Sequence, residues 1–194
     1  MKNFLQIIMI TILLLGCKNE TKKEVKNEHQ NHQVDKKETS KKKVLSPHTY
    51  AMAMIGDAHV HIDYSSPSVR GRIIFGGLLA YDEVWQSGAH KATWLESNKD
   101  LSIAGKTLKA GKYGVFTIPS KEKWTVIFNT KWDQHGKDEY DASEDVLRFK
   151  VTPELSNEIT ESLTYQVKKT SDTEGTISLS WEKVSINFPF QIKE

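Results

Sequence analysis

The sequence predicts an all-β domain: a single antiparallel β-sandwich or barrel-like fold of about eight or nine strands, with at most one or two short helices. Two observations lead to this prediction. Apolar and polar residues alternate over short runs, which is the pattern of half-buried strands. Gly, Pro, Asn and Asp separate these runs at short intervals, as turns between antiparallel strands require. The folded part is expected to span residues 46–194, the size of one domain.

The first strong strand is expected at residues 58–64, where every second residue is apolar and shares one face: Ala58, Val60, Ile62 and Tyr64. Later strands are expected at 93–96, in a hairpin of 101–103 with 106–108, and at 113–118, 124–129, 146–151, 163–167, 176–181 and 186–190. A short helix is expected near 81–86 or near 153–158.

Most of the tryptophans are expected in the core, because large aromatic side chains dominate core burial. The four expected there are Trp85, Trp94, Trp124 and Trp181. A row of tryptophans at the surface would instead indicate stacking against sugars.

The N-terminus is similar to a bacterial lipoprotein signal. Lys2 provides a positive start, residues 4–15 form an apolar stretch too short to span a bilayer, and Gly16 precedes the only cysteine, Cys17. We therefore expect residues 1–16 to be a signal peptide and Cys17 to carry acyl chains such as palmitate. The protein would then be lipid-anchored to a membrane of the bacterial cell envelope, on its periplasmic or surface face.

Residues 17–45 are expected to form the lipidated cysteine and a flexible charged tether, because they contain too few apolar residues to form a core. From residue 18 the tether holds nine lysines and five acids, a net charge of +4, whereas residues 46–194 hold 17 basic and 20 acidic residues, a net charge of −3. A slightly acidic domain argues against a nucleic-acid partner, which requires a clustered basic face. The expected partners are the membrane, through the anchor, and a small molecule, a glycan or an envelope protein.

Three ordered blocks of the domain resemble the family called domain of unknown function 2911. They are Tyr64–Gly77 (YSSPSVRGRIIFGG), the segment 83–93 with its EVW, GA and AT pairs, and 110–129 with its AGKY, FTIP and WTVIFN runs. The resemblance covers about Ser46 to Ile192 and implies a secreted or lipid-anchored bacterial protein of one domain without an assigned activity. His59, His61, Gln86 and His90 depart from the pattern of that family.

Four histidines are candidate metal ligands. His59 and His61 lie two residues apart in an expected strand, so both imidazoles are expected on the polar face. A third ligand would come from His90 or His135, and three imidazoles with an open position suit zinc, whereas copper also binds imidazole. The alternative is that these histidines are solvated residues of a polar strand face.

Two arginines and one tryptophan are candidate ligand-binding residues. Arg70 and Arg72 flank Gly71 after a Ser-Ser-Pro turn and could hold a carboxylate or a phosphate. Trp85 is a further candidate for the rim of an apolar pocket. The alternative is that one arginine pairs with a neighbouring acid and fixes the turn. The chain has no nucleophile elbow, phosphate loop or His-Glu-x-x-His helix, so no motif supports an enzyme and catalytic residues are not assigned.

Three functions are therefore compatible with the sequence, and each predicts a different geometry. A non-catalytic binding domain predicts a concave apolar pocket rimmed by Arg70, Arg72 or Trp85. A metal-binding protein or metal-dependent enzyme predicts that His59, His61 and a third histidine converge within about 4–5 Å. An interaction domain predicts a long exposed edge strand and no pocket.

Overall fold

A computed structural model describes residues 44–193 of the chain. The expected signal peptide, Cys17 and nearly all of the expected tether lie outside the described residues. Within 44–193 no helix is long and apolar enough to cross a membrane. The prediction of an all-β fold is confirmed, because ten strands and one short 3-10 helix make up the regular structure of this part of the chain.

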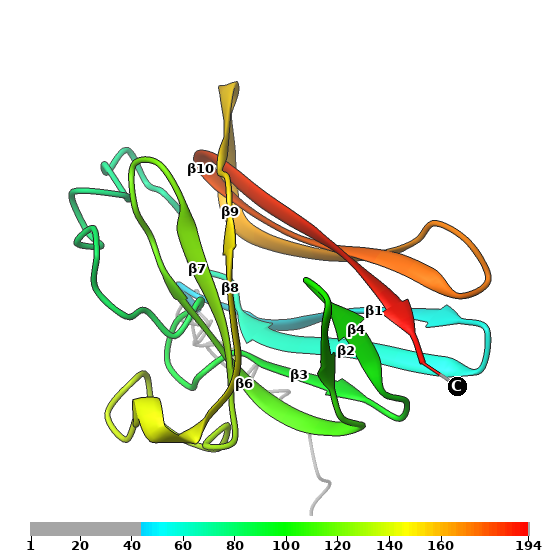
Figure 1. The fold of residues 1–194 in the computed structure, drawn as a ribbon. Helices are drawn as coiled ribbons and strands as arrows, with labels where there is room; N and C mark the ends of the chain where they lie inside the picture. The colour runs from blue at the N-terminus through cyan, green and yellow to red at the C-terminus, as the bar shows by residue number, and fades with distance from the viewer. Residues whose placement is uncertain (1–43, 194) are drawn as a thin grey trace, which may run out of the picture. The chain divides into compact units, whose positions relative to one another are not determined.

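The strands form two antiparallel sheets (Figure 1). The six-stranded sheet has the order β1-β2-β3-β6-β7-β8 and the four-stranded sheet the order β5-β4-β10-β9. The bounds of the first sheet are β1 His48–Ile55, β2 Ala58–Ser65, β3 Trp94–Ser97, β6 Gly111–Ile118, β7 Trp124–Asn129 and β8 Asp145–Val151. Those of the second are β4 Leu101–Ile103, β5 Lys106–Leu108, β9 Glu154–Lys169 and β10 Glu174–Ile192, and the helix η1 spans Ala142–Glu144.

The alternation in β2 defines the inner and outer faces of the six-stranded sheet. Ala58, Val60, Ile62 and Tyr64 are buried, whereas the residues between them are half-buried on the opposite face, as the sequence predicts. β1 pairs with β2 along its whole length, from His48 opposite Ser65 to Ile55 opposite Ala58. The outer side chains of the two strands therefore lie directly across from one another.

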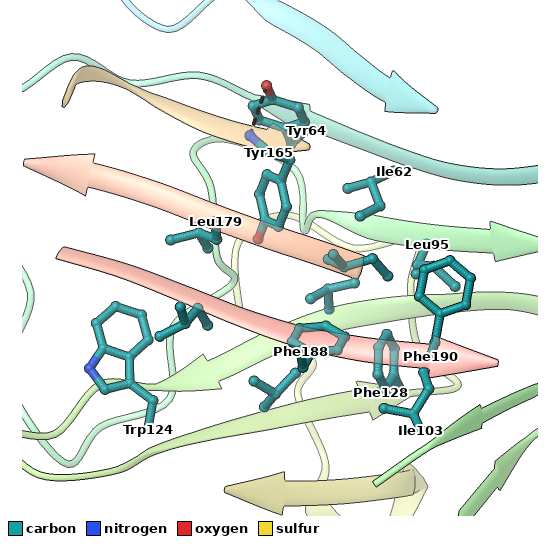
Figure 2. Close-up of a cluster of buried hydrophobic side chains, with 14 of the residues drawn as sticks. Ile62, Tyr64, Leu95, Ile103, Trp124, Phe128, Tyr165, Leu179, Phe188 and Phe190 are labelled. Atoms are coloured by element: carbon teal, nitrogen blue, oxygen red, sulfur yellow. Dashed lines mark hydrogen bonds between the residues drawn. The ribbon is translucent and has the colours of Figure 1, made fainter. Parts of the chain in front are cut away.

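The core lies between the two sheets and is rich in aromatic rings (Figure 2). Phe188 of β10 packs edge-to-face on Phe128 of β7, with ring centroids 6.4 Å apart. Tyr64 packs edge-to-face on Tyr165 of β9 at 4.8 Å, and its hydroxyl accepts a hydrogen bond from the Tyr165 N–H. These contacts join the two sheets through residues far apart in sequence, 101 positions for Tyr64 and Tyr165.

β10 is one continuous strand in which the buried face changes parity. Ile177, Leu179 and Trp181 are buried at odd positions, and Ile186 and Phe188 are buried at even ones. Register shifts against β9 lie on either side of Glu182, which has a positive φ of 56°. A bulge adds one residue and reverses the alternation, so the two strands expected at 176–181 and 186–190 are parts of a single strand.

Two other expectations about elements are wrong. No helix forms at 81–86, which is a series of turns. No helix forms at 153–158 either, because this segment lies in β9 apart from its first residue. The only helical turn in the described residues is η1. In addition, the sequence did not indicate β1. Its exposed face carries Tyr50, Met52 and Met54 rather than charged residues, so the alternation has little polar contrast.

Candidate functional site

A long connection, residues 66–93, joins β2 to β3 (Figure 1). It carries all three candidate ligand-binding residues, Arg70, Arg72 and Trp85. Its first part is held against β9: the Val69 N–H donates to the Glu161 carbonyl at 2.7 Å, and the Leu163 N–H donates to the Pro67 carbonyl at 2.9 Å. The Ser66 hydroxyl also donates to the carbonyl of Leu163. These bonds fix the segment that leads directly to Arg70 and Arg72.

The second part of this connection is held by β6 and β9. Trp85 and Thr117 exchange two backbone hydrogen bonds of 2.8 and 2.9 Å. The carbonyl of Ser87 accepts from the buried hydroxyls of Tyr165 at 2.9 Å and Thr93 at 3.0 Å. Burial strongly raises the pKa of Tyr165, so this tyrosine stays protonated and remains a donor. The loop is therefore an ordered structure on both sides of the candidate site.

Between these two parts lies a pocket of about 400 Å³. The lining includes Arg70, Arg72, Trp85, His90 and Trp181, together with the aliphatic Leu78 and Leu79. Trp85 and Trp181 stack at 5.8 Å between ring centroids, and both are almost fully buried. The structure thus brings together all three predicted ligand-binding residues and adds His90, which the sequence suggested as a metal ligand.

The charge of the lining is positive. No acidic residue lines the pocket within the described chain. Arg148 pairs with Asp145 at 3.3 Å, but neither pocket arginine has an ion pair with a described residue. In the described residues, therefore, no acidic side chain neutralises either arginine. The Glu161 carboxylate instead accepts from the backbone N–H of Arg70 at 2.9 Å.

Both guanidinium groups are positioned by backbone carbonyls and keep free donors. Arg70 donates from Nη2 to the Leu45 carbonyl at 2.7 Å. Arg72 donates from Nε to Val69 at 3.0 Å and from Nη2 to Ser68 at 2.6 Å. A guanidinium has about five N–H donors, so most of them remain available to an anion.

The backbone around the pocket is held in an uncommon conformation. Three residues have a positive φ in the left-handed region: Arg70 (φ 51°), Ser87 (φ 55°) and His90 (φ 62°). Residues other than glycine rarely adopt this backbone conformation. Such residues concentrate at binding sites, where the surrounding structure holds them. Here the hydrogen bonds to β6 and β9 supply that restraint.

Trp181 contributes its ring to the pocket lining, whereas its indole nitrogen is buried away from the pocket. Its indole nitrogen is buried and has no hydrogen-bond partner in the described residues, whereas Trp85 Nε1 donates to the Gly88 carbonyl at 3.1 Å. A buried donor without a partner costs roughly 1–3 kcal/mol, and such groups are rare in folded proteins. The sequence placed Trp181 in the core but gave no sign of this donor.

A second hollow of about 450 Å³ lies between the turn of the β4–β5 hairpin and β10. Phe190 is its only aromatic lining residue, and its one charged lining residue is Glu174. It offers no set of converging recognition groups, so the arginine pocket is the stronger candidate.

The histidine candidates fall into two separate pairs. His59 and His61 lie on the outer face of β2 with ring centroids 5.8 Å apart. His90 and His135 are neighbours through their backbones: Lys91 pairs with His135, and the Gly136 N–H donates to the His90 carbonyl at 2.6 Å. Within residues 44–193 no group of three or more His, Cys, Asp or Glu side chains is placed to hold a metal ion. β3 begins at Trp94, opposite Asp63 of β2, and His90 comes four residues before it. His90 therefore lies near the end of β2 that is opposite to His59.

An aromatic row crosses the outer face near His61. The imidazole of His61 stacks between Tyr50 at 5.3 Å and Trp94 at 5.2 Å, and burial there lowers its pKa. Lys112 Nζ lies 3.4 Å from the ring centroid of Trp94 and 3.8 Å from that of Trp132. Trp94 is therefore half-buried on the outer face and not in the core, contrary to expectation.

The fold and the site define a class: an antiparallel β-sandwich with an ordered arginine-containing pocket at the connection between β2 and β3. Residues 46–190 match the family model described as Protein of unknown function (DUF2911), and the chain belongs to this family. This confirms the family resemblance of the sequence. No curated protein and no solved structure matches the chain.

Proposed function

We propose that this protein is a lipid-anchored binding protein of the bacterial cell envelope, and that its pocket binds a small molecule with an anionic group and a flat apolar part. The anionic group would accept hydrogen bonds from Arg70 and Arg72. The apolar part would pack on Leu78, Leu79 and Trp85. The proposed role is binding without catalysis, because the charged groups of the lining are the two arginines, and no carboxylate accompanies Ser46 and His90 there to complete a catalytic set.

The observation that carries this proposal is the combination of two arginines with no acidic residue around a pocket of about 400 Å³. Pockets for small molecules are mostly apolar and contain a few placed polar groups. Arginine is well suited to carboxylate and phosphate, because its planar donors match both oxygens of the anion.

The proposal that the protein is lipid-anchored rests on its N-terminal sequence. Cys17 follows a short apolar stretch and Gly16, which is the arrangement expected of a lipoprotein signal. Residues 44–193 contain no helix that could span a bilayer. An acylated Cys17 would hold the domain at the membrane, and the residues up to Leu45 would connect the two.

A matched set of ligands tests the pocket. The full chain carrying Cys17→Ala, purified in mild detergent, is titrated calorimetrically with phenyl phosphate and phenylacetate and with the neutral analogue phenylacetamide. We expect the anions to bind and the amide to bind at least about tenfold more weakly, because charge-assisted hydrogen bonds contribute roughly 1.5–3 kcal/mol each.

The variants Arg70→Gln and Arg72→Gln are each expected to weaken anion binding by about tenfold or more. Arg148→Gln removes the same charge from β8, outside the pocket, and serves as the matched control. Equal affinity of the three variants for phenyl phosphate, or preference for the neutral amide, would contradict the proposal.

A further inference from the structure

The outer face of the β1–β2 hairpin carries an unusual pair of exposed methionines. Of the four methionines in the chain, the two within the described residues are Met52 and Met54. Both lie on the solvent side of β1, with 44% and 52% of their surfaces exposed. Their thioethers are therefore accessible and do not fill the core.

Each methionine lies directly across from a histidine. The register pairs Met52 with His61 and Met54 with His59. Side chains directly opposite each other in an antiparallel pair have Cβ atoms about 4.5–5.5 Å apart and point to the same face. The two imidazole rings are themselves adjacent, with centroids 5.8 Å apart. The hairpin thus gathers two thioethers and two imidazoles into one four-residue group.

We infer that this group binds a soft monovalent metal ion of the copper(I) type through four side chains: Met52, Met54, His59 and His61. Thioether sulfur is a soft ligand that favours copper(I), and imidazole also binds copper. Zinc would be expected to use Cys, His or carboxylate ligands, and no cluster of three such ligands occurs in residues 44–193.

The surroundings support this assignment. The stacking of His61 between Tyr50 and Trp94 restricts the orientation of its ring, and a ligand held in place before binding forms a tighter site. Glu96 lies opposite His61 on the other side, in β3, and adds negative charge near the cation. Lys112, the next residue in that row, carries a positive charge that opposes that of Glu96, and its ammonium group lies on the rings of Trp94 and Trp132.

This site is separate from the arginine pocket and shares no residue with it. It also differs from the three-histidine arrangement predicted from sequence, because the missing ligands come from methionines of β1. The metal site and the proposed function can therefore be tested independently of each other.

The test is a copper(I) titration of the full chain in competition with bathocuproine disulfonate, under anaerobic conditions with ascorbate. Every protein carries Cys17→Ala, because the one thiol of the chain would itself bind copper(I). We expect one ion per chain. The variant Met52→Leu/Met54→Leu, which keeps the apolar volume, is expected to bind at least 10- to 100-fold more weakly, the loss seen even for outer partners of a metal site.

The double variant His90→Gln/His135→Gln is the matched control, because it removes two exposed imidazoles outside the group and is expected to bind copper(I) as the parent protein does. A direct readout on the parent protein is the methyl NMR spectrum of ¹³C-methionine with silver(I) as a diamagnetic probe. The Met52 and Met54 signals should shift at one equivalent.

Three results would overturn the inference: no copper(I) retained by the parent protein, equal affinity in the methionine variant, or unchanged Met52 and Met54 methyl signals with silver(I). The NMR result needs no variant, so it decides the matter even if a substitution disturbs folding.

Discussion

At the scale of single residues, the pocket depends on groups whose positions are tightly restricted. Gly88 lines it, and a Cβ at this position would lie 2.6 Å from Thr93 Oγ1 and 3.4 Å from the Ser65 carbonyl. Thr93 Oγ1 cannot easily move away, because it donates to the Ser87 carbonyl in the buried loop. Glycine at this position therefore follows from packing.

We expect Gly88→Ala to destabilise the protein by about 1–3 kcal/mol, the usual cost of inserting a methyl group into a packed site. Urea unfolding followed by tryptophan fluorescence measures this. Gly71→Ala is the comparison, since a Cβ there meets nothing within 4 Å and only its positive φ of 67° opposes the change. A Gly88→Ala protein as stable as the parent would show that the loop packs differently.

Tyr140 provides a pH-dependent prediction. Burial and a hydrogen bond from its hydroxyl to Asp145 raise the pKa of Tyr140 to about 12. An unfolded tyrosine ionises near 10, so ionisation favours the unfolded chain above that pH. The stabilising contribution is complete below pH 10 and is lost as the pH rises toward 12.

Tyr140→Phe is therefore expected to lose less stability than the parent between pH 10 and 12. Urea unfolding at pH 9, 10 and 11 gives the comparison, and Tyr50→Phe, at an exposed position on β1, is the control. Parallel curves for Tyr140→Phe and the parent would contradict the assigned hydrogen bond.

At the scale of elements, the connection between β2 and β3 is as important as the strands. Tyr165 of β9 reaches this loop through its hydrogen bond to the Ser87 carbonyl. Thr93 also donates to that carbonyl, so the loss of Tyr165 Oη does not leave it without a partner. We expect Tyr165→Phe to cost only about 0.5–1.5 kcal/mol, the net value of one hydrogen bond.

The same substitution should speed amide hydrogen exchange in residues 85–93 more than in the core of β7, because it releases the loop from the second sheet. Exchange measured by mass spectrometry checks this. Unchanged protection of 85–93 would mean that β6 alone holds the loop.

The sequence predicted the strands wherever one face differs clearly from the other, as in β2. It failed at β1, where Met52 and Met54 face the solvent, and at β10, where a bulge at Glu182 reverses the alternation. Arg70, Arg72 and Trp85 could be proposed because they lie close together in one segment. Trp181 could not be assigned to the pocket, because it comes from a strand about a hundred residues later and arrives there only through the packing of two sheets.

At the scale of the whole domain, the two candidate sites use different parts of one sandwich. The pocket lies where the loop meets β10 and where Leu45 and Ser46 enter the domain. The Met–His group lies on the outer face of the first hairpin. The proposed lipid anchor at Cys17 would precede the pocket residue Leu45 by fewer than 30 residues.

Anion binding by the arginine pocket is tested most directly by the indole N–H spectrum of the ¹⁵N-labelled full chain during titration with phenyl phosphate. Trp181→Phe assigns the Trp181 resonance among the five tryptophans. If the arginine pocket binds anions, this resonance shifts because the Trp181 ring lines the pocket and stacks on Trp85, and the shift disappears in Arg70→Gln/Arg72→Gln. An unmoved Trp181 resonance at saturating ligand, with shifts only at Trp94 or Trp132, would contradict the account and place binding on the outer face.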